Sequence, residues 1–235
     1  MASSKTWYSH EKRGEIPFSW GIPGSTLAAS SPDALSWYQE TAKPNDAFVN
    51  YGDPYLYIDS SSASPDFGNM VSKHQAHAQA IELNTALFFC EDWKSLGTQA
   101  GVDIIAKADQ QLEAAFLIQY SSYAAGRGAI LYGTRDDGSK LPVVTARTHL
   151  WSQPDNEEWG GPQHVAEQLN DWAKGGAQNI AERVAYIPVN AWSTFEFDGR
   201  KFGAFEGTLE TAKRLNPNIK LVTIPQLSKL LKNVV

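Results

Sequence analysis

Residues 86–123 decide the fold class and read ALFFCEDWKSLGTQAGVDIIAKADQQLEAAFLIQYSSY. The apolar runs at 86–91 and 114–123 have the length of strands, and the polar stretch at 92–111 between them has the length of a helix. A strand, a helix and a second strand in this order indicate a βαβ unit, in which the two strands lie parallel.

The same alternation continues in both directions along the chain. Further strands are expected at 14–22, 46–51, 128–133, 141–151, 183–192 and 219–225. Helices are expected at 30–43, 69–83, 162–174, 203–215 and 226–234. Seven to eight mostly parallel strands predict an α/β fold, a single (β/α) barrel over residues 1–235, either complete or distorted and incomplete. A doubly wound open sheet is the alternative, and no linker divides the chain.

The composition excludes several classes of protein. Hydrophobic residues make up 42% of the 235 residues and charged residues 20%, which is typical of a globular chain and not of a disordered one. The formal net charge is −6, so the chain lacks the basic excess typical of nucleic-acid and anionic-membrane partners. Aromatic residues, with 8 Trp, 9 Tyr and 10 Phe, indicate a large core, a surface that stacks on a flat ligand, or both.

The single cysteine and the beginning of the sequence carry further expectations. Cys90 excludes an internal disulfide and a cysteine-rich zinc site, and its place in an apolar run favours simple packing. Residues 1–15 contain no apolar segment typical of a signal peptide, and no run of about 18 apolar residues follows. The sequence as written therefore predicts a cytoplasmic protein without a membrane partner, although a secreted protein with its signal removed would read the same.

Ring-bearing and polar residues follow the predicted strands. In either architecture, ligands bind at the carboxyl ends of the strands, and a sugar needs ring faces for its C–H surface and polar groups for its hydroxyls. The residues expected to bind such a ligand are Trp20, Tyr51, Tyr55, Tyr120, Arg147, Trp151, Asn190 and Trp192. The three tryptophans could instead pack the rim of the sheet. His149 follows a strand as well, but it is isolated in the sequence and is assigned no role.

The carboxylates are the candidates for chemistry. Glycoside hydrolysis uses two carboxyl groups about 5–10 Å apart, a separation that neighbouring strand ends can supply. Asp53, in a Gly-Asp-Pro loop, is therefore predicted to act with Glu91 or Asp92 as the acid and base. Glu157 and Glu158 are second choices. For each acid taken alone, the alternative is a solvated or helix-capping carboxylate.

Metal and nucleotide motifs are weak or missing. His74 and His77 form an H-x-x-H pair that could share one helix face and bind a metal with Asp46 or Asp53, or could simply be solvated. The sequence lacks a G-x-S-x-G elbow, a phosphate-binding loop of the Walker type and a G-x-G-x-x-G run after its first strand. No cofactor and no metal are therefore expected.

The stretch IPFSWGIPGSTLAASSPDALSWYQETAKPNDAFVNYGDPYLYID at 16–59 resembles the C-terminal domain of the GxGYxYP putative glycoside hydrolases. The matching residues are Trp20, Trp37, Tyr38, Pro44, Asn45, Asp46 and Phe48, and later segments are similar in order and spacing. The signature itself departs from the family, because Pro54 replaces a glycine and Ile58 the last proline, while Tyr55 and Tyr57 are kept. The resemblance implies a distorted (β/α) barrel and an activity on carbohydrates.

Three functions remain open from the sequence. The first is a carbohydrate-active hydrolase, with a paired-carboxylate site in an aromatic cleft. The second is a lectin-like binding protein on a degenerate barrel, favoured by the altered signature, in which a Pro restricts a loop that Gly leaves free. The third is a metal-dependent hydrolase similar to polysaccharide deacetylases. Each takes a carbohydrate or another small polar ligand as its partner.

Overall fold

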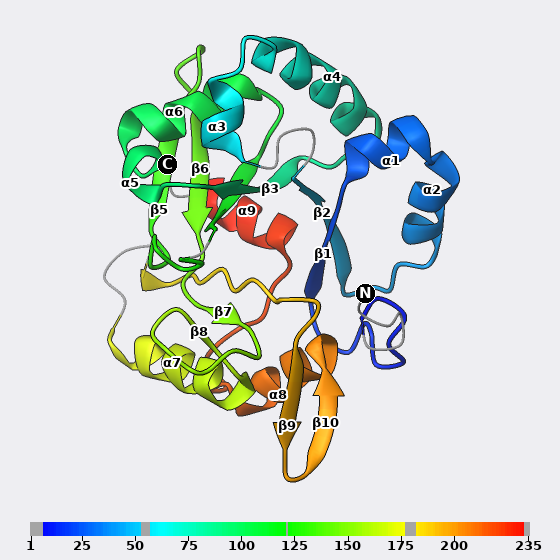
Figure 1. Cartoon of the computed structure of the whole chain (residues 1–235), viewed down its shortest axis with the longest axis vertical. Coiled ribbons are helices and arrows are strands. Elements are labelled where there is room, and N and C mark those ends of the chain that lie inside the picture. Colours follow the sequence, from blue (N-terminus) through cyan, green and yellow to red (C-terminus); the bar gives the residue numbers. More distant parts are fainter. Residues whose placement is uncertain (1–6, 53–56, 121, 177–181, 233–235) are drawn as a thin grey trace.

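The computed structural model describes residues 7–52, 57–120, 122–176 and 182–232 (Figure 1). Its central sheet has six strands in the order β1-β2-β3-β4-β6-β5. Their bounds are β1 (Phe18–Ile22), β2 (Asp46–Tyr51), β3 (Thr85–Cys90), β4 (Ala114–Gln119), β5 (Ile130–Thr134) and β6 (Lys140–Thr145). Neighbouring strands run parallel except β5, which lies antiparallel to β6 at the edge. The prediction of an α/β fold with a mainly parallel sheet is confirmed.

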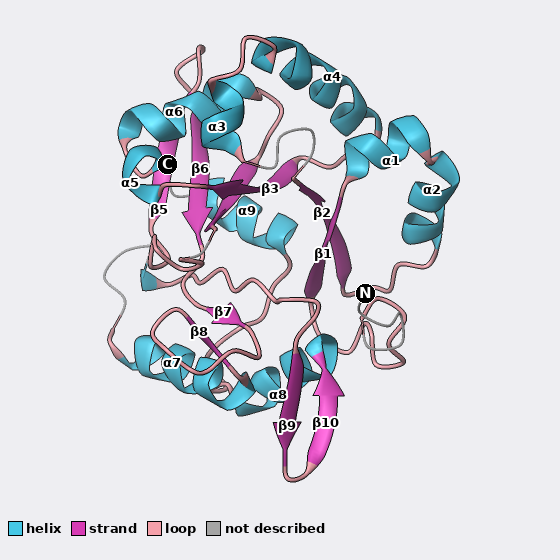
Figure 2. Cartoon of the chain, in the orientation of Figure 1, coloured by secondary structure: helices cyan, strands magenta, loops and turns pink. Residues whose placement is uncertain are grey.

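The helices lie outside the sheet (Figure 2); α1 to α6 connect its strands in the chain, and α7 to α9 follow its last strand, β6. They are α1 (Gly24–Ser30), α2 (Pro32–Glu40), α3 (Ile58–Ser62), α4 (Phe67–Ala80), α5 (Trp93–Leu96), α6 (Gln99–Ala108), α7 (Pro162–Lys174), α8 (Ala204–Arg214) and α9 (Ile224–Lys232). The single helix predicted at 92–111 is two helices, because Gly97 and the capping residue Thr98 interrupt it. None of the described helices is both long and apolar enough to cross a bilayer.

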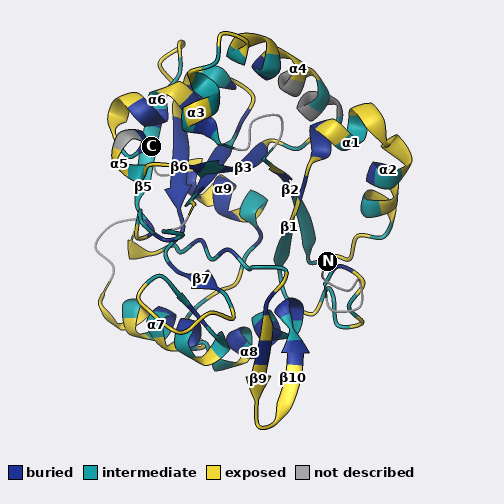
Figure 3. Cartoon of the chain, viewed as in Figure 1, coloured by how far each residue is buried: buried dark blue, intermediate teal, exposed yellow. Residues whose placement is uncertain are grey.

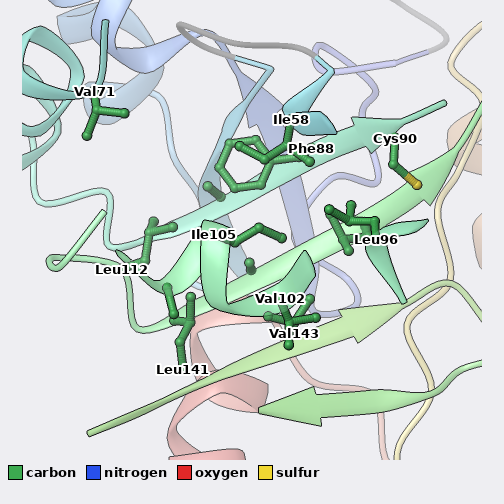
Figure 4. Packing of buried hydrophobic residues seen from close by; sticks show 14 residues of the cluster. Ile58, Val71, Phe88, Cys90, Leu96, Val102, Ile105, Leu112, Leu141 and Val143 are labelled. Atoms are coloured by element: carbon green, nitrogen blue, oxygen red, sulfur yellow. The ribbon is translucent and has the colours of Figure 1, made fainter. Parts of the chain in front are cut away.

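One face of the sheet packs against α3, α5 and α6. Alternate residues of the strands point to this face, where Phe88 of β3 packs in one buried cluster with Val102 and Ile105 of α6 (Figure 4). Leu117 of β4 belongs to the same cluster. Cys90 belongs to the same cluster and is fully buried, which confirms that it packs as a small apolar residue. Burial raises the pKa of its thiol to about 12, so the thiol stays protonated and unreactive near neutral pH.

The opposite face of the sheet packs against α9. Leu87, Phe116 and Ile118 alternate with the residues of the first face and contact a cluster that includes Leu231 of α9. The strands therefore have two buried faces, as their near-continuous apolar sequences predict, and the buried strands stand out at the centre of the molecule (Figure 3).

Beyond β6 the sheet becomes irregular. The strand predicted at 141–151 is divided into β6 and β7 (His149–Leu150), and β7 pairs with β8 (Trp159–Gly160). The segment predicted as a strand at 183–192 makes only isolated bridges, from Tyr186 to Ala146 and from Val189 to Leu150. The segment at 219–223 forms no strand, although the Ile224 amide donates a hydrogen bond to Ser19 Oγ of β1 at 2.8 Å. In the described part of the chain no strand ladder closes the sheet into a barrel.

A β-hairpin that the sequence analysis did not predict projects below α8 in Figure 1. It consists of β9 (Thr194–Phe197) and β10 (Arg200–Gly203), paired antiparallel. Asp198 and Gly199 connect the strands with φ values of 51° and 71°. An Asp-Gly pair suits this turn because both of its central residues need a positive φ, which these residue types tolerate best.

Candidate functional site

A cavity of about 920 Å3 lies on the α9 side of the sheet. Its lining includes Val49 and Tyr51 of β2, Leu87 and Phe89 of β3, and Ile118 of β4. Residues that follow the strands complete the wall toward the carboxyl edge of the sheet, where α/β proteins bind their ligands. Residues of α7 and α8 also belong to the lining.

Tyrosine rings gather along this cavity. Its lining includes Tyr51, Tyr57, Tyr120, Tyr123 and Tyr186. Tyr57 lies with its ring centroid 6.2 Å from that of Tyr120, which in turn is 6.1 Å from that of Tyr123. Tyr120 is 55% exposed and Tyr186 only 6%, so the series runs from a solvated rim to a dry interior.

Burial is the main cause that raises the pKa of four of these phenols. The pKa of Tyr51 is raised by burial and then by the nearby hydroxyls of Tyr57 and Tyr123. The pKa of Tyr186 is raised well above its ordinary value by burial and by Tyr51. The pKa values of Tyr57 and Tyr123 are also raised, with burial as the largest cause. These four phenols therefore stay neutral near pH 7 and present hydroxyl donors and acceptors instead of charges.

His149 lines the same cavity and is 4% exposed. Its ring centroid lies 5.2 Å from that of Tyr123 and 5.8 Å from that of Trp151. Neither ring nitrogen has a hydrogen-bond partner among the described residues. Burial lowers the pKa of its imidazole to about 4, so the ring is neutral at physiological pH.

Asn190 and Trp192, which follow the segment at 184–189, also line the cavity. The Asn190 side-chain oxygen accepts a hydrogen bond from the Trp192 amide at 3.1 Å, and the Asn190 amide donates to the Leu150 carbonyl. This turn holds Trp192 outward, with 72% of the residue exposed. Among the described lining residues, the charged ones are Glu182, Arg183 and Lys220.

The predicted ligand-binding residues divide into two groups. Tyr51, Tyr120, Asn190 and Trp192 line the cavity. Arg147 and Trp151 do not belong to its lining: the Arg147 guanidinium lies 4.5 Å from the Trp172 ring centre, and Trp151 packs behind Tyr123 at 4.8 Å. Tyr55 lies outside the described residues.

Trp20 is a correction to the predicted ligand-binding set. It is 3% exposed and packs among Trp7, Tyr8, Phe18 and Phe205. Its indole N–H donates to Asp46 Oδ1 at 2.8 Å, which satisfies its polar atom within the protein. It therefore stabilises the packing of β1 against the N-terminal segment and α8, and it has no face left for a sugar.

The predicted catalytic acids are placed only in part. Asp53 lies outside the described residues. Glu91 and Asp92 follow β3 and are exposed, and their backbone amides donate to Asp59 Oδ2 at 2.7 and 3.0 Å. Asp92 caps α5 by accepting a hydrogen bond from the Lys94 backbone amide. This is the helix-capping carboxylate that the sequence analysis gave as the alternative to a catalytic acid. Glu91 does not belong to the cavity lining, but its charge is one of the smaller causes that raise the pKa of Tyr57, after burial and Tyr120.

The second-choice acids and the histidine pair have other surroundings. Glu158 accepts a hydrogen bond from Ser122 Oγ, and Glu157 forms an exposed ion pair with Arg127. In the described part of the chain, no group of three His, Cys, Asp or Glu side chains is arranged to hold a metal ion, and the His74 side chain lies outside that part. Asp46, one suggested third ligand, instead accepts from Trp20 and the Lys43 amide and lies 3.6 Å from Arg13.

The sequence analysis missed the roles of His149 and Tyr186 in this cavity. Both belong to segments predicted as strands, and a strand pattern does not show which neighbour faces inward when the strand is irregular. In the structure, His149 and Asn190 line the cavity together with their neighbours Leu150 and Val189, which pack in a cluster with Val165 of α7. Their inward position depends on this cluster of distant segments.

Comparison with known proteins agrees with the geometry of the fold. Over residues 1–232 the chain matches the family described as "GxGYxYP putative glycoside hydrolase C-terminal domain". Among solved structures, a "putative hydrolase" from Bacteroides thetaiotaomicron VPI-5482 is similar, with a TM-score of 0.76 and 21% sequence identity. That similarity covers 99% of this chain and 42% of the other, so this chain spans less than half the length of its structural neighbour.

The curated proteins contain no match to this sequence. The family match nevertheless spans almost all of the chain, including every strand of the central sheet. The chain therefore belongs to the family of GxGYxYP putative glycoside hydrolase C-terminal domains.

Proposed function

We propose that this chain binds a saccharide in the cavity and hydrolyses a glycosidic bond there. The cavity itself carries the proposal, because a space of about 920 Å3 at the carboxyl edge of a parallel sheet is lined by tyrosine and tryptophan rings together with Asn190. Rings of this kind pack against the C–H faces of a sugar, while neutral hydroxyl and amide groups bind its hydroxyls. Membership of the family and the described hydrolase neighbour support the same class of activity.

We also propose that the cavity is the interior of an incomplete (β/α) barrel. The bridges at Tyr186 and Val189 continue the sheet beyond β6, and the hydrogen bond from Ile224 to Ser19 joins the last segment to β1. Segments 184–189 and 219–223 would then take the places of two further strands. This arrangement accounts for a cavity that contacts β1 to β4 on one side and these two segments on the other.

For the chemistry, we propose Glu91 as one carboxyl group, with Asp53 or Asp92 as its partner. The support for Glu91 is its position directly after β3, where its charge is one of the causes that raise the pKa of the lining residue Tyr57. A general acid or base contributes about 100- to 10,000-fold to a rate. Glu91→Gln should therefore lower turnover by at least about 100-fold while the chain stays folded.

Asp92 has a sharper test because it also caps a helix. Asn caps a helix about as well as Asp, so Asp92→Asn keeps the cap and removes the acid. Incubation with a panel of oligosaccharides, followed by measurement of released reducing ends, should show loss of turnover in Glu91→Gln and in either Asp53→Asn or Asp92→Asn. Full activity in all three variants would refute the paired-carboxylate assignment.

A lectin-like binding function is the second candidate, and one observation favours it. Among the described lining residues, Glu182 is the single carboxylate. Both functions predict that Trp192→Ala weakens saccharide binding by about tenfold, because an exposed stacking ring is lost. Trp37→Ala is the matched control, since Trp37 is also exposed, at 46%, but lies on α2 outside the cavity. Binding without product after prolonged incubation would favour the lectin-like function.

A further inference from the structure

We infer that His149 and Tyr186 form an uncharged inner subsite of the cavity, which binds hydroxyl groups of a neutral sugar and disfavours a sugar acid. This inference rests on the proposed saccharide binding and adds to it the residues and the ligand class. Two independent observations carry it: both side chains line the cavity, and both carry buried polar atoms without a partner among the described residues.

The missing partners call for an explanation. A buried polar atom without a hydrogen bond costs a protein stability, and native structures contain few of them. Here the Tyr186 hydroxyl and both nitrogens of His149 belong to two residues that line one cavity. A ligand that supplies the missing hydrogen bonds would account for both residues together.

The backbone directs both residues inward. Tyr186 forms the bridge to Ala146, and its ring packs edge-on against Phe116 on the α9 face of the sheet, with centroids 5.1 Å apart. The His149 ring packs against Tyr123 and Trp151, and its neighbour Leu150 packs with Val165 of α7 in a cluster that also lines the cavity. Packing contacts within the fold therefore hold both residues at the cavity, and their position does not depend on a ligand.

The ring contacts described for the two residues are all with uncharged side chains. His149 contacts Tyr123 and Trp151, and Tyr186 contacts Phe116 and interacts electrostatically with Tyr51. A carboxylate placed among these groups would lose its hydration without gaining a cation. A sugar hydroxyl loses less, because a neutral imidazole and a phenol can both donate and accept. The subsite therefore selects hydroxyl over carboxylate.

Access requires one side chain to move. The polar atoms of His149 and Tyr186 are out of contact with solvent, whereas Tyr123, which packs against His149, is half-buried. Rotation of the Tyr123 ring would open a path from the rim, and side-chain rotamer changes of this kind are common on binding. Tyr123 thus lies between the exposed ring of Tyr120 and the buried ring of His149.

The test uses the full chain and compares variants in which the polar atoms of each side chain are removed while an aromatic ring is kept. Tyr186→Phe removes only the hydroxyl, and His149→Phe removes the ring nitrogens. Tyr132→Phe is the matched control, because the Tyr132 hydroxyl is also buried without a described partner but lies outside the cavity lining. Thermal unfolding first establishes that each variant folds. Calorimetry then measures affinity for neutral oligosaccharides of gluco-, galacto-, manno- and xylo-configuration, and for their uronic-acid counterparts.

We expect neutral oligosaccharides to bind, and Tyr186→Phe and His149→Phe each to weaken that binding about tenfold, with Tyr132→Phe unchanged. Uronic-acid oligosaccharides should bind at least about tenfold more weakly than the neutral ones. If the parent chain binds neither class, saccharide binding itself is wrong, and the subsite fails with it. If the chain binds saccharides and loses affinity in Trp192→Ala but not in Tyr186→Phe or His149→Phe, the proposed function stands and the subsite is refuted. Equal or tighter binding of the uronic acids would refute the preference for neutral sugars.

Discussion

At the scale of single residues, His149 gives a prediction that needs no ligand. Burial lowers the pKa of its imidazole from 6.5 to about 4, so the unfolded chain binds a proton in a pH range where the folded chain does not. The stability of the fold should therefore fall as the pH drops from 6.5 toward 4, by roughly 3 kcal/mol from this residue. Urea unfolding at pH 7 and pH 4.5 measures the effect.

The matched comparison for this prediction is His149→Phe, which cannot take up a proton. Carboxylates also titrate in this range, but they contribute equally to both proteins, so the difference between the two isolates the histidine. The variant should lose less stability on acidification than the parent chain. An identical loss in both proteins would show that His149 is protonated in the fold or is solvated.

At the scale of an element, α6 begins at a cap that can be tested separately. Thr98 accepts a hydrogen bond from the Gly101 amide at 3.1 Å, which satisfies one of the free amides in the first turn. Thr98→Ala should lower the free energy of unfolding by about 1 kcal/mol. Thr98→Ser keeps the hydroxyl and should retain most of the free energy of unfolding that Thr98→Ala loses. Denaturant unfolding compares the three chains, and equal stability of Thr98→Ala and the parent would show that the cap contributes nothing.

At the scale of the whole molecule, α9 covers the sheet face opposite α6. Leu231 is fully buried between α9 and the strands, whereas Leu230, next to it, is 51% exposed. Leu231→Ala should lower the free energy of unfolding by about 2–5 kcal/mol because it leaves a cavity in the core. Leu230→Ala, the control on the same helix, should change it by less than about 0.5 kcal/mol. Similar effects of the two variants in denaturant unfolding would contradict this packing.

Much of the fold could be predicted from local patterns. The parallel strands β2, β3 and β4 are short apolar runs separated by polar helical stretches, and this pattern predicts their order and direction without tertiary information. The turn at Asp136–Gly138 between β5 and β6 follows from its residue types, since Gly138 has a φ of 82°. The position of the cavity near Tyr51 and Tyr120 follows from the rule that places ligand sites at strand ends.

The sequence by itself determined the α/β class, the parallel strands and four of the residues that line the cavity, because these depend on the periodicity and order of neighbouring residues. Only the tertiary structure decided that Trp20 is buried while Trp192 is exposed, and that His149 and Tyr186 face inward. Both tryptophans lie in strand-like stretches, but Phe205 and Leu209 of α8 pack against Trp20, whereas 72% of Trp192 is exposed. The physical reason is that side-chain direction in an irregular strand is set by contacts between segments distant in the chain, which no local pattern records.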